Sequence, residues 1–217
     1  MGNGTRMSRP LPDAEYQAAI NSNNPSATNP FLTGSASGVV GVIDGSTGDS
    51  NTVTNSNAET NITTNNFDFV VAPGELIAGD RIRITAYARY SMGPATPKNL
   101  QIRLKVNSTT FGIIVISATK AIAMPLNQNN KGIWIDAQIA IRSAGAAGTL
   151  ISGMNLAIGD ATAANPGITD VDPSVGTFSI DTTTTNTFNF SAQWSVGAPT
   201  AQATITFEEI VYEKLRV

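Results

Sequence analysis

The acidic side chains are the residues of this chain best suited to chemistry, because histidine and cysteine are both absent. Without them the Ser–His–Asp and Cys–His nucleophile systems cannot be built, and ordinary zinc sites lack their usual ligands. A serine activated by lysine would need a buried lysine, and no lysine lies in a clearly apolar stretch. The lysines are Lys98, Lys105, Lys120, Lys131 and Lys214. Carboxylates are therefore the remaining candidates for catalysis or metal binding.

Two carboxylate arrangements match known chemistry in part. A glycosidase needs two carboxylates that face each other across a cleft, and Asp136 in WIDAQ and Glu208 in FEEI are candidates. Strand alternation places each of them opposite the apolar residues, which favours a solvated surface instead. Calcium prefers clustered oxygens, as in the loop with Asp160, Asp170 and Asp172, but their spacing does not match an EF-hand. We therefore expect no enzymatic activity, no cofactor and no catalytic metal, and a cation in that loop stays an open alternative.

Exposed aromatic side chains offer a third kind of chemistry, the stacking of sugar rings. Tyr87 and Tyr90 lie near Arg89, and Trp134 and Trp194 are the only tryptophans. Trp194 alternates with phenylalanines and is expected in the core. Trp134 falls on the face opposite its isoleucine neighbours, where it would reach a second sheet or a neighbouring subunit. Recognition of a glycan is therefore kept as an alternative function.

Period-two alternation of apolar and polar residues dominates residues 67–217. RIRITAYARY places isoleucines and alanines on one face and arginines on the other, and NLQIRLKV, GIWIDAQIAIRS and TFNFSAQWSV repeat the pattern. TFGIIVIS is a nearly continuous apolar run, which predicts a strand buried on both faces. The alternation predicts an interior that contains Ile82, Ile84, Ile102, Leu104, Ile139 and Phe190.

These strands predict an all-β fold, an antiparallel jelly-roll sandwich preceded by an extended N-terminal arm with a short helix. About eight strands or more follow one another at the spacing of a sandwich, and no crossover helix separates them. Two Greek keys that form a jelly roll fit the long apolar runs best. An immunoglobulin-like sandwich is the alternative, although its Cys–Trp–Cys signature is missing.

The chain divides into three zones. Residues 1–33 form an arm, in which Asp13 caps a helix over residues 14–20. Residues 34–66 form a connector rich in Gly, Ser, Asn and Thr with edge strands, and residues 67–217 form the sandwich. The arm is too short to fold alone, so we expect it to dock on another protein. The residues expected to make that contact are Tyr16, Ile20, Phe31 and Leu32.

Low charge sets this chain apart from most soluble domains. Charged residues make up 13% of it, against about 25% in a typical domain, and the net charge is −3. No clustered lysines and arginines are present for nucleic acid or an anionic membrane surface, and no run approaches the ~20 apolar residues of a transmembrane helix. The chain also begins without the apolar region of a Sec signal. We expect neither a nucleic-acid partner nor membrane insertion, and a weakly charged surface suits permanent assembly.

Three stretches resemble virion proteins of tailed bacteriophages. AINSNNPSATNPFLT is similar to an Asn- and Pro-marked leader that recurs in them, and LIAGDRIRITAYARYS with KNLQIRLKVNSTTF resembles a segment of phage jelly-roll modules. DTTTTNTFNFSAQWSVGAPTAQATITFEEIVYEKL resembles the closing strands of those modules. The resemblance covers the leader and most of residues 67–217.

The resemblance implies a structural component of a bacteriophage virion, a capsid decoration or cement protein or a short head fibre anchored through its arm. It further implies a homotrimer that contacts the major capsid protein or other virion proteins. Such a protein is made in the host cytoplasm, becomes part of the virion and is released by lysis. A tail-fibre or receptor-binding module that recognises host surface glycans is the alternative.

Overall fold

Alternating side chains produce the long strands, because the apolar row packs inward while the polar row faces solvent. RIRITAYARYSM becomes β5 (Arg81–Met92), in which every second residue from Ile82 onward is buried. The same pattern produces β9 (Gln128–Ser143) and β10 (Gly148–Ile158). The period-two prediction is confirmed for β5 and β9.

The computed structural model describes residues 40–62, 67–94, 98–119, 121–159, 167–169, 177–195 and 203–215. All regular structure in these ranges is β-strand, and none of them contains a helix long and apolar enough to cross a membrane. The other strands are β1 (Val40–Thr47), β2 (Val53–Thr54), β3 (Thr60–Asn61), β4 (Phe69–Val71), β6 (Asn99–Ser108), β7 (Gly112–Ala118), β8 (Ile122–Ala123), β11 (Gly167–Thr169), β12 (Thr177–Ile180), β13 (Asn186–Trp194) and β14 (Ala203–Leu215).

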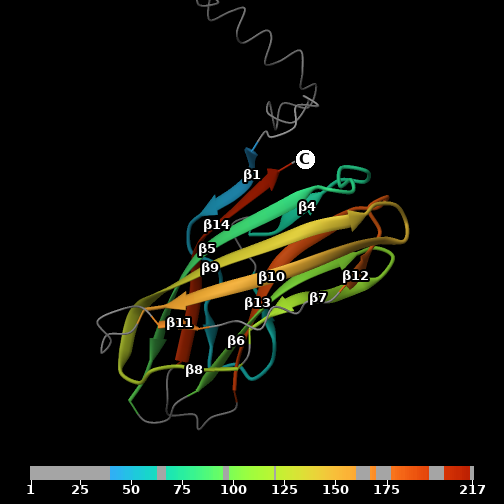
Figure 1. Cartoon of the computed structure of the whole chain (residues 1–217). Coiled ribbons are helices and arrows are strands. Elements are labelled where there is room, and N and C mark those ends of the chain that lie inside the picture. Colours follow the sequence, from blue (N-terminus) through green and yellow to red (C-terminus); the bar gives the residue numbers. More distant parts are fainter. Residues whose placement is uncertain are drawn as a thin grey trace, which may run out of the picture.

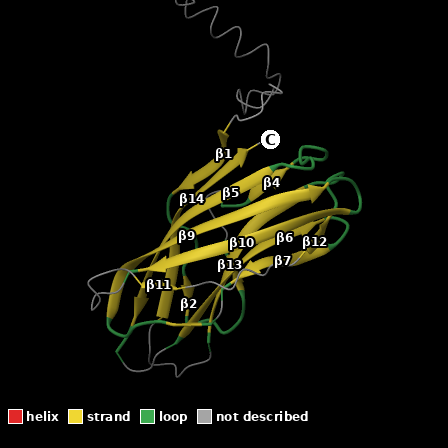
Figure 2. Ribbon diagram, in the orientation of Figure 1, coloured by secondary structure: helices red, strands yellow, loops and turns green. Residues whose placement is uncertain are grey.

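The strands form a larger and a smaller sheet. The larger sheet has eight strands in the order β1-β14-β5-β9-β10-β11, with β12 also paired to β10 and β2 to β14. The smaller sheet has six strands in the order β3-β13-β6-β7, with β4 also paired to β13 and β8 to β6. Every pairing is antiparallel. In Figures 1 and 2 the larger sheet faces the viewer and the smaller sheet lies behind it, which confirms the all-β, antiparallel part of the prediction.

The core lies between the two sheets and contains the interior residues predicted from alternation. Phe69 of the smaller sheet stacks on Tyr212 of the larger sheet, with ring centroids 4.9 Å apart. Trp194 is fully buried, as expected, and its Nε1 donates a hydrogen bond to the carbonyl of Val53 at 3.1 Å. The predicted residues, each at most 1% exposed, are Ile82, Ile84, Ile102, Leu104, Ile139 and Phe190.

Strand β7 does not have the burial on both faces that the run TFGIIVIS predicts. It ends the smaller sheet within the described part of the chain and pairs with β6 along one edge. Ile113 is 63% exposed, and Phe111 and Val115 are also exposed, whereas Ile116 is buried. No described strand covers the outward face of β7, so only its inward row is buried. The prediction for this strand is wrong on that face.

Three of the lysines are buried, although none lies in a clearly apolar stretch of the sequence. Lys98 Nζ donates a hydrogen bond to an asparagine side chain at 2.9 Å. Lys105 Nζ lies 2.8 Å from a carboxylate oxygen of Glu59. Lys214 Nζ lies 3.2 Å from Asp80 Oδ2. Each ammonium group therefore has the polar partner that burial of a charge requires.

The segment expected to be a connector supplies three strands to the two sheets. β1 and β2 both pair with β14, and β3 pairs with β13. Val53 and Ile62 of this segment lie in the hydrophobic core. The arm of residues 1–33 and its short helix lie outside the described residues. The same holds for the expected docking residues Tyr16, Ile20, Phe31 and Leu32.

Asp68, immediately before β4, has a buried carboxylate oxygen without a hydrogen-bond partner among the described residues. Burial raises the pKa of this carboxyl above its ordinary value of 3.8, although a hydrogen bond from Asn189 opposes the shift. A carboxyl whose pKa is raised by folding takes up a proton more readily when folded, so its ionisation lowers stability as pH rises above 3.8.

Asp68→Asn should therefore stabilise the protein at neutral pH. We expect the Tm at about pH 7 to rise by about 2–4 °C, which corresponds to roughly 1 kcal/mol in a chain of this size. Near pH 3 the carboxyl is protonated in both the folded and the unfolded chain, so the gain should vanish there. Thermal unfolding of both proteins across this pH range checks the result. A gain of the same size at every pH would contradict it.

Candidate functional site

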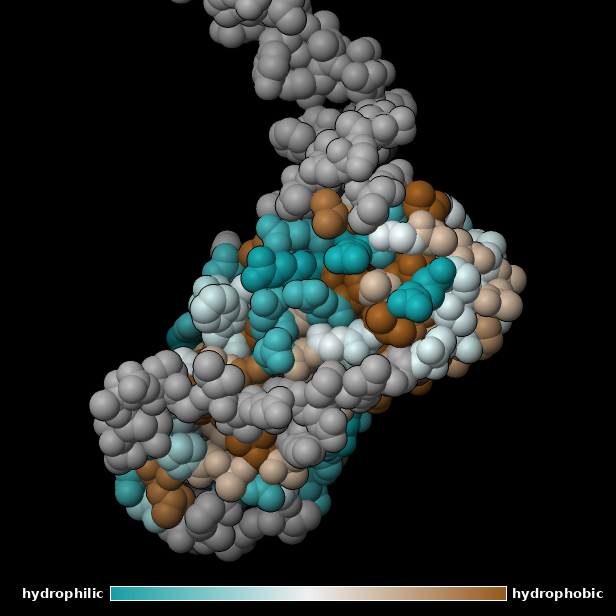
Figure 3. All heavy atoms as spheres, in the orientation of Figure 1, coloured by the Kyte–Doolittle hydropathy of each residue, from teal (hydrophilic) through white to brown (hydrophobic). Residues whose placement is uncertain are grey.

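The outer face of the larger sheet gathers polar and aromatic side chains from neighbouring strands. Antiparallel pairing places Arg83 beside Gln138 and Tyr87 beside Trp134. These residues belong to the polar rows of β5 and β9, whose apolar rows fill the core. Figure 3 shows this face, on which hydrophilic side chains gather over β14, β5 and β9 beside hydrophobic atoms. The face thus combines charge, amide groups and exposed apolar surface.

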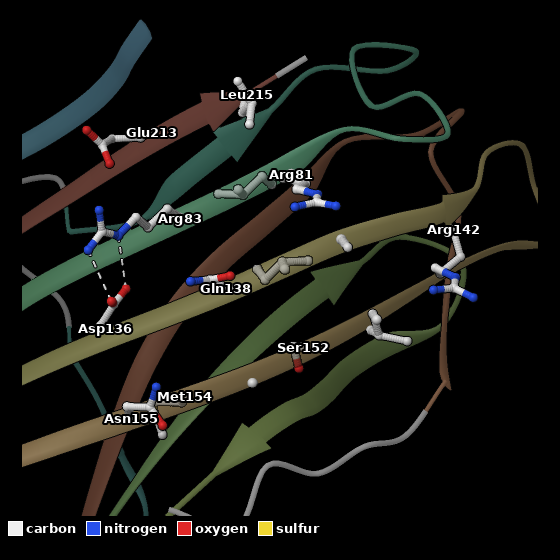
Figure 4. A pocket seen from close by; sticks show the side chains of 15 residues that line it. Arg81, Arg83, Asp136, Gln138, Arg142, Ser152, Met154, Asn155, Glu213 and Leu215 are labelled. Atoms are coloured by element: carbon white, nitrogen blue, oxygen red, sulfur yellow. Dashed lines mark hydrogen bonds and ion pairs between the residues drawn. The ribbon is translucent and has the colours of Figure 1, made fainter. Parts of the chain in front are cut away.

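A hollow of about 770 Å³ lies on this face, where β14, β5, β9 and β10 run side by side (Figure 4). Its volume is within the range of about 300–1,000 Å³ that is typical of small-molecule sites. Ile151 and Leu215 contribute apolar surface to its lining. The polar lining consists of three arginines, two amides, two carboxylates and a serine: Arg81, Arg83, Arg142, Gln138, Asn155, Asp136, Glu213 and Ser152.

The Arg83 guanidinium is occupied by a partner within the hollow. Its Nε and Nη2 each lie 3.1 Å from one carboxylate oxygen of Asp136, which makes a two-point ion pair. The hydrogen bond to Asp136, followed by the negative charges of Asp136 and Glu213, raises the pKa of Arg83. The positive charge of Arg83 is therefore largely neutralised by its own neighbours.

Arg81 and Arg142 are in a different situation. Both side chains are exposed, and neither forms an ion pair with the residues that the structure describes. Figure 4 shows Arg142 at one end of the hollow and the pair of Arg83 and Asp136 at the other, with Arg81 between them. Because a guanidinium presents several N–H donors in one plane, the two groups can receive a carboxylate or another planar anion.

The exposed aromatic pair lies beyond the end of the hollow marked by Asp136. Tyr87 and Trp134 stack with ring centroids 5.8 Å apart and are 43% and 47% exposed. On the other side of Trp134, β10 places Ala157, whose methyl group is too small to cover an indole ring. Trp134 therefore does not reach the second sheet, and it keeps a flat apolar surface open to solvent.

The side chains that the sequence offers for chemistry are held apart in surface ion pairs. Asp136 pairs with Arg83, and an oxygen of Glu208 lies 2.5 Å from Arg89 Nη1. This agrees with the solvated positions expected from alternation. Tyr90 is buried, and its hydroxyl donates a hydrogen bond to a backbone carbonyl at 2.8 Å, so it cannot stack on a sugar.

The three aspartates considered for calcium lie outside the described residues: Asp160, Asp170 and Asp172. Within the described ranges, no three acidic side chains are grouped to hold a metal ion. The arginines of the hollow, in contrast, are a group that sequence patterns do not single out. The available signal was the polar rows of two strands, which place Arg81 and Arg83 on one strand and Arg142 on another.

A second surface of interest is the edge of the smaller sheet. The hydroxyl of Ser152 in β10 donates a hydrogen bond to the carbonyl of Ile116 in β7 and joins the two sheets there. Beside that contact, the outward row of Phe111, Ile113 and Val115 forms an exposed apolar row, referred to below as the β7 row. Exposed apolar side chains on an edge strand are typical of surfaces that meet another chain.

Comparisons with known proteins yield no family for this chain. No protein-family model matches it, and no curated protein matches it. Among solved structures it is similar to a chain in the structure of infectious bursal disease virus, Gt strain, with a TM-score of 0.31 and 8% sequence identity. The similarity covers 82% of this chain and 33% of the viral one, so the chain spans about a third of that protein's length.

Proposed function

We propose that this chain is a structural component of a tailed-bacteriophage virion, a capsid decoration or cement protein or a short head fibre. In this role it is not an enzyme, and its partners are copies of itself and the major capsid protein or other virion proteins. The support is the resemblance of its leader and of its strands to phage modules, together with the exposed β7 row. That row carries the proposal, because it is the described apolar surface best placed to meet a second chain.

A jelly roll is the topology we propose for the sandwich. The support is the order in which strands alternate between the sheets. In the larger sheet the order β1-β14-β5-β9 and in the smaller sheet the order β4-β13-β6-β7 correspond to two interleaved Greek keys. In this view β10, β11 and β12 extend one edge of the larger sheet. Such a sandwich displays a rigid surface while its arm is left to make contacts elsewhere.

A homotrimer is the assembly we propose. A strand at the edge of a sheet presents unpaired N–H and C=O groups, and natural proteins cover such edges or charge them. The β7 row is neither charged nor covered by another described strand. A closed symmetric assembly would bury it in each copy, and three arms would then act together on one particle. The contacts proposed for the arm are those of Tyr16, Ile20, Phe31 and Leu32.

Light scattering combined with particle binding tests this function. The free protein should have three times the 22.6 kDa mass of one chain. Ile113→Asp should give folded monomers, because a charge cannot be buried unpaired in the interface. The double variant Phe31→Ala with Leu32→Ala should stay trimeric. When it is mixed with phage particles that do not carry the wild-type protein, it should not pellet with them. Ile77→Asp, which changes an exposed isoleucine before β5, is the matched control and should behave as wild type.

A monomeric wild-type protein at micromolar concentration would overturn the trimer. Particle binding that is unchanged in the double arm variant would overturn the docking role of the arm. A wild-type protein that never pellets with particles would overturn the virion role itself.

Recognition of host surface glycans by a tail-fibre module is a second candidate function. The specific observation that favours it is the exposed stack of Tyr87 and Trp134 beside the hollow. The two functions are compatible, since a decoration protein and a fibre module can both carry a sugar-binding face.

A further inference from the structure

We propose that the outer face of the larger sheet binds an acidic oligosaccharide. A carboxylate of the ligand lies between Arg81 and Arg142, and one of its sugar rings stacks on Trp134. This inference rests on the second candidate function, glycan recognition, and names the class of its ligand. It does not depend on the structural role, because it concerns a different face from the β7 row.

The charges in the hollow favour a ligand with separate carboxylates. Arg83 already holds Asp136, so the cations available to a ligand are Arg81 and Arg142. Ala140, which pairs with Arg81 across the strands, lies two residues before Arg142 on the same face of β9 and leaves space between the two guanidinium groups. A planar carboxylate can receive parallel N–H donors from such groups, and Gln138 nearby can hydrogen-bond a hydroxyl.

The aromatic pair favours a ligand with flat apolar faces, as sugar rings have. Tyr87 stacks on one side of Trp134, and the small Ala157 on the neighbouring strand leaves the other side open. A sugar ring placed there would bury C–H groups against the indole and keep its hydroxyls free to reach polar neighbours. Asp136 lies two residues from Trp134 on β9, and Asn155 lies two residues from Ala157 on β10, so both are on the same face. Together they supply hydrogen-bond donors and acceptors.

The distance between the two ends of the face requires a chain of sugars. Arg81 and Tyr87 are separated by six positions along β5, which is roughly 20 Å at about 3.3 Å per residue. A single sugar cannot contact both ends, whereas an oligosaccharide can lie along the strands. The ligand is therefore an extended molecule with its acid group in the hollow and a ring at the aromatic pair.

Nucleic acid fits this face less well than an acidic sugar. Its binding depends on many lysines and arginines that neutralise closely spaced phosphates. Here Asp136, Glu209 and Glu213 share the face with the arginines, and the whole chain has a net charge of −3. Such a surface repels duplex nucleic acid, which carries about one charge per 1.7 Å, more strongly than an oligosaccharide with one carboxylate per sugar ring.

Calorimetry of the full chain with a matched pair of ligands tests the proposal. The acidic probes are tetragalacturonate and a sialic-acid tetramer, and the neutral control is fully methyl-esterified tetragalacturonate. We expect binding of at least one acidic probe and little binding of the ester. Arg81→Gln, Arg142→Gln and Trp134→Ala should each weaken binding by about tenfold or more, as loss of a charged hydrogen bond or a stacking surface does. Higher salt should weaken binding of the acidic probe to the wild-type protein. The same increase in salt should weaken binding to Arg142→Gln by a smaller factor.

Two variants control for net charge and for loss of an aromatic ring. Lys131→Gln removes a positive charge from the opposite end of β9, and Phe111→Ala removes an exposed ring from the β7 row. Both should bind the acidic probe as wild type does. The proposal is overturned if neither acidic probe binds at about 1 mM, or if the ester binds equally well. It is also overturned if the controls weaken binding as much as the site variants do.

Discussion

Ile139→Asp should leave the chain unable to fold into a soluble form. Ile139 is 1% exposed within β9 and lies beside Ile82 on β5. An aspartate there would place a carboxylate in apolar surroundings without an ion-pair partner, which costs several kcal/mol. A domain is stable by only about 5–15 kcal/mol, so this cost and the lost packing together remove most of its stability. The soluble fraction after expression, and circular dichroism of any soluble protein, measure the effect.

Two controls separate burial from charge. Gln138→Asp adds the same carboxylate at the preceding residue of the strand, where the side chain is exposed, and this variant should stay folded. Ile139→Val keeps the site apolar and should cost about 0.5–1.5 kcal/mol. If Ile139→Asp were soluble and had the same melting temperature as the wild-type protein, the assignment of inward and outward faces in β9 would be wrong.

The inward and outward faces of the long strands could be predicted because the outer face of each sheet is exposed to solvent. In such a sheet the side-chain pattern repeats every two residues, so one apolar row identifies the buried face of the whole strand. Ile82 and Ile139 were assigned in this way on separate strands, and the structure pairs them directly. Local alternation therefore carried most of the information about the core.

The burial of β7 could not be predicted, because it depends on the order of strands in the sheet. A continuous apolar run has no period that distinguishes a strand covered on both faces from an edge strand with an apolar outer row. Ile113 and Ile116 have similar local sequence surroundings, yet one is exposed and the other buried. Ile113 belongs to the outward row and Ile116 to the buried side of the same strand, and the outward row is exposed because no described strand covers it.

The hollow and the buried lysines have the same origin in distant contacts. Lys105 sits in the polar row of β6, and it is covered because Glu59 and Asn61 from a much earlier segment lie over it. Arg81 and Arg142 meet only because β9 runs antiparallel to β5 and brings its end beside the start of that strand. Composition and alternation identify such side chains as polar, but only strand pairing shows which of them come together.

Asp80→Ala should destabilise the protein by about 3–5 kcal/mol, the usual effect of breaking a buried ion pair. Asp80 Oδ2 lies 3.2 Å from Lys214 Nζ, and the two side chains are 0% and 6% exposed. The same oxygen accepts a hydrogen bond from the backbone N–H of Ile77 at 3.1 Å, and Lys214 also donates to the carbonyl of Glu75. The pair therefore fastens the last described strand, β14, to the turn that precedes β5. Removal of the carboxylate leaves an ammonium group buried without its counter-charge.

A second substitution tests this prediction further, because it should raise stability and not lower it. Lys214→Met added to Asp80→Ala removes the stranded ammonium group, so the double variant should be more stable than Asp80→Ala alone. Arg83→Met is the matched control, because it breaks the exposed pair of Arg83 and Asp136, whose side chains are 50% and 28% exposed. It should destabilise the protein far less than Asp80→Ala, since water screens an exposed ion pair. Urea unfolding of the four proteins gives the free energies. If Asp80→Ala and Arg83→Met lowered the free energy of unfolding equally, burial would not determine the strength of the Asp80 pair. If the double variant were less stable than Asp80→Ala, Lys214 would stabilise β14 through its other contacts.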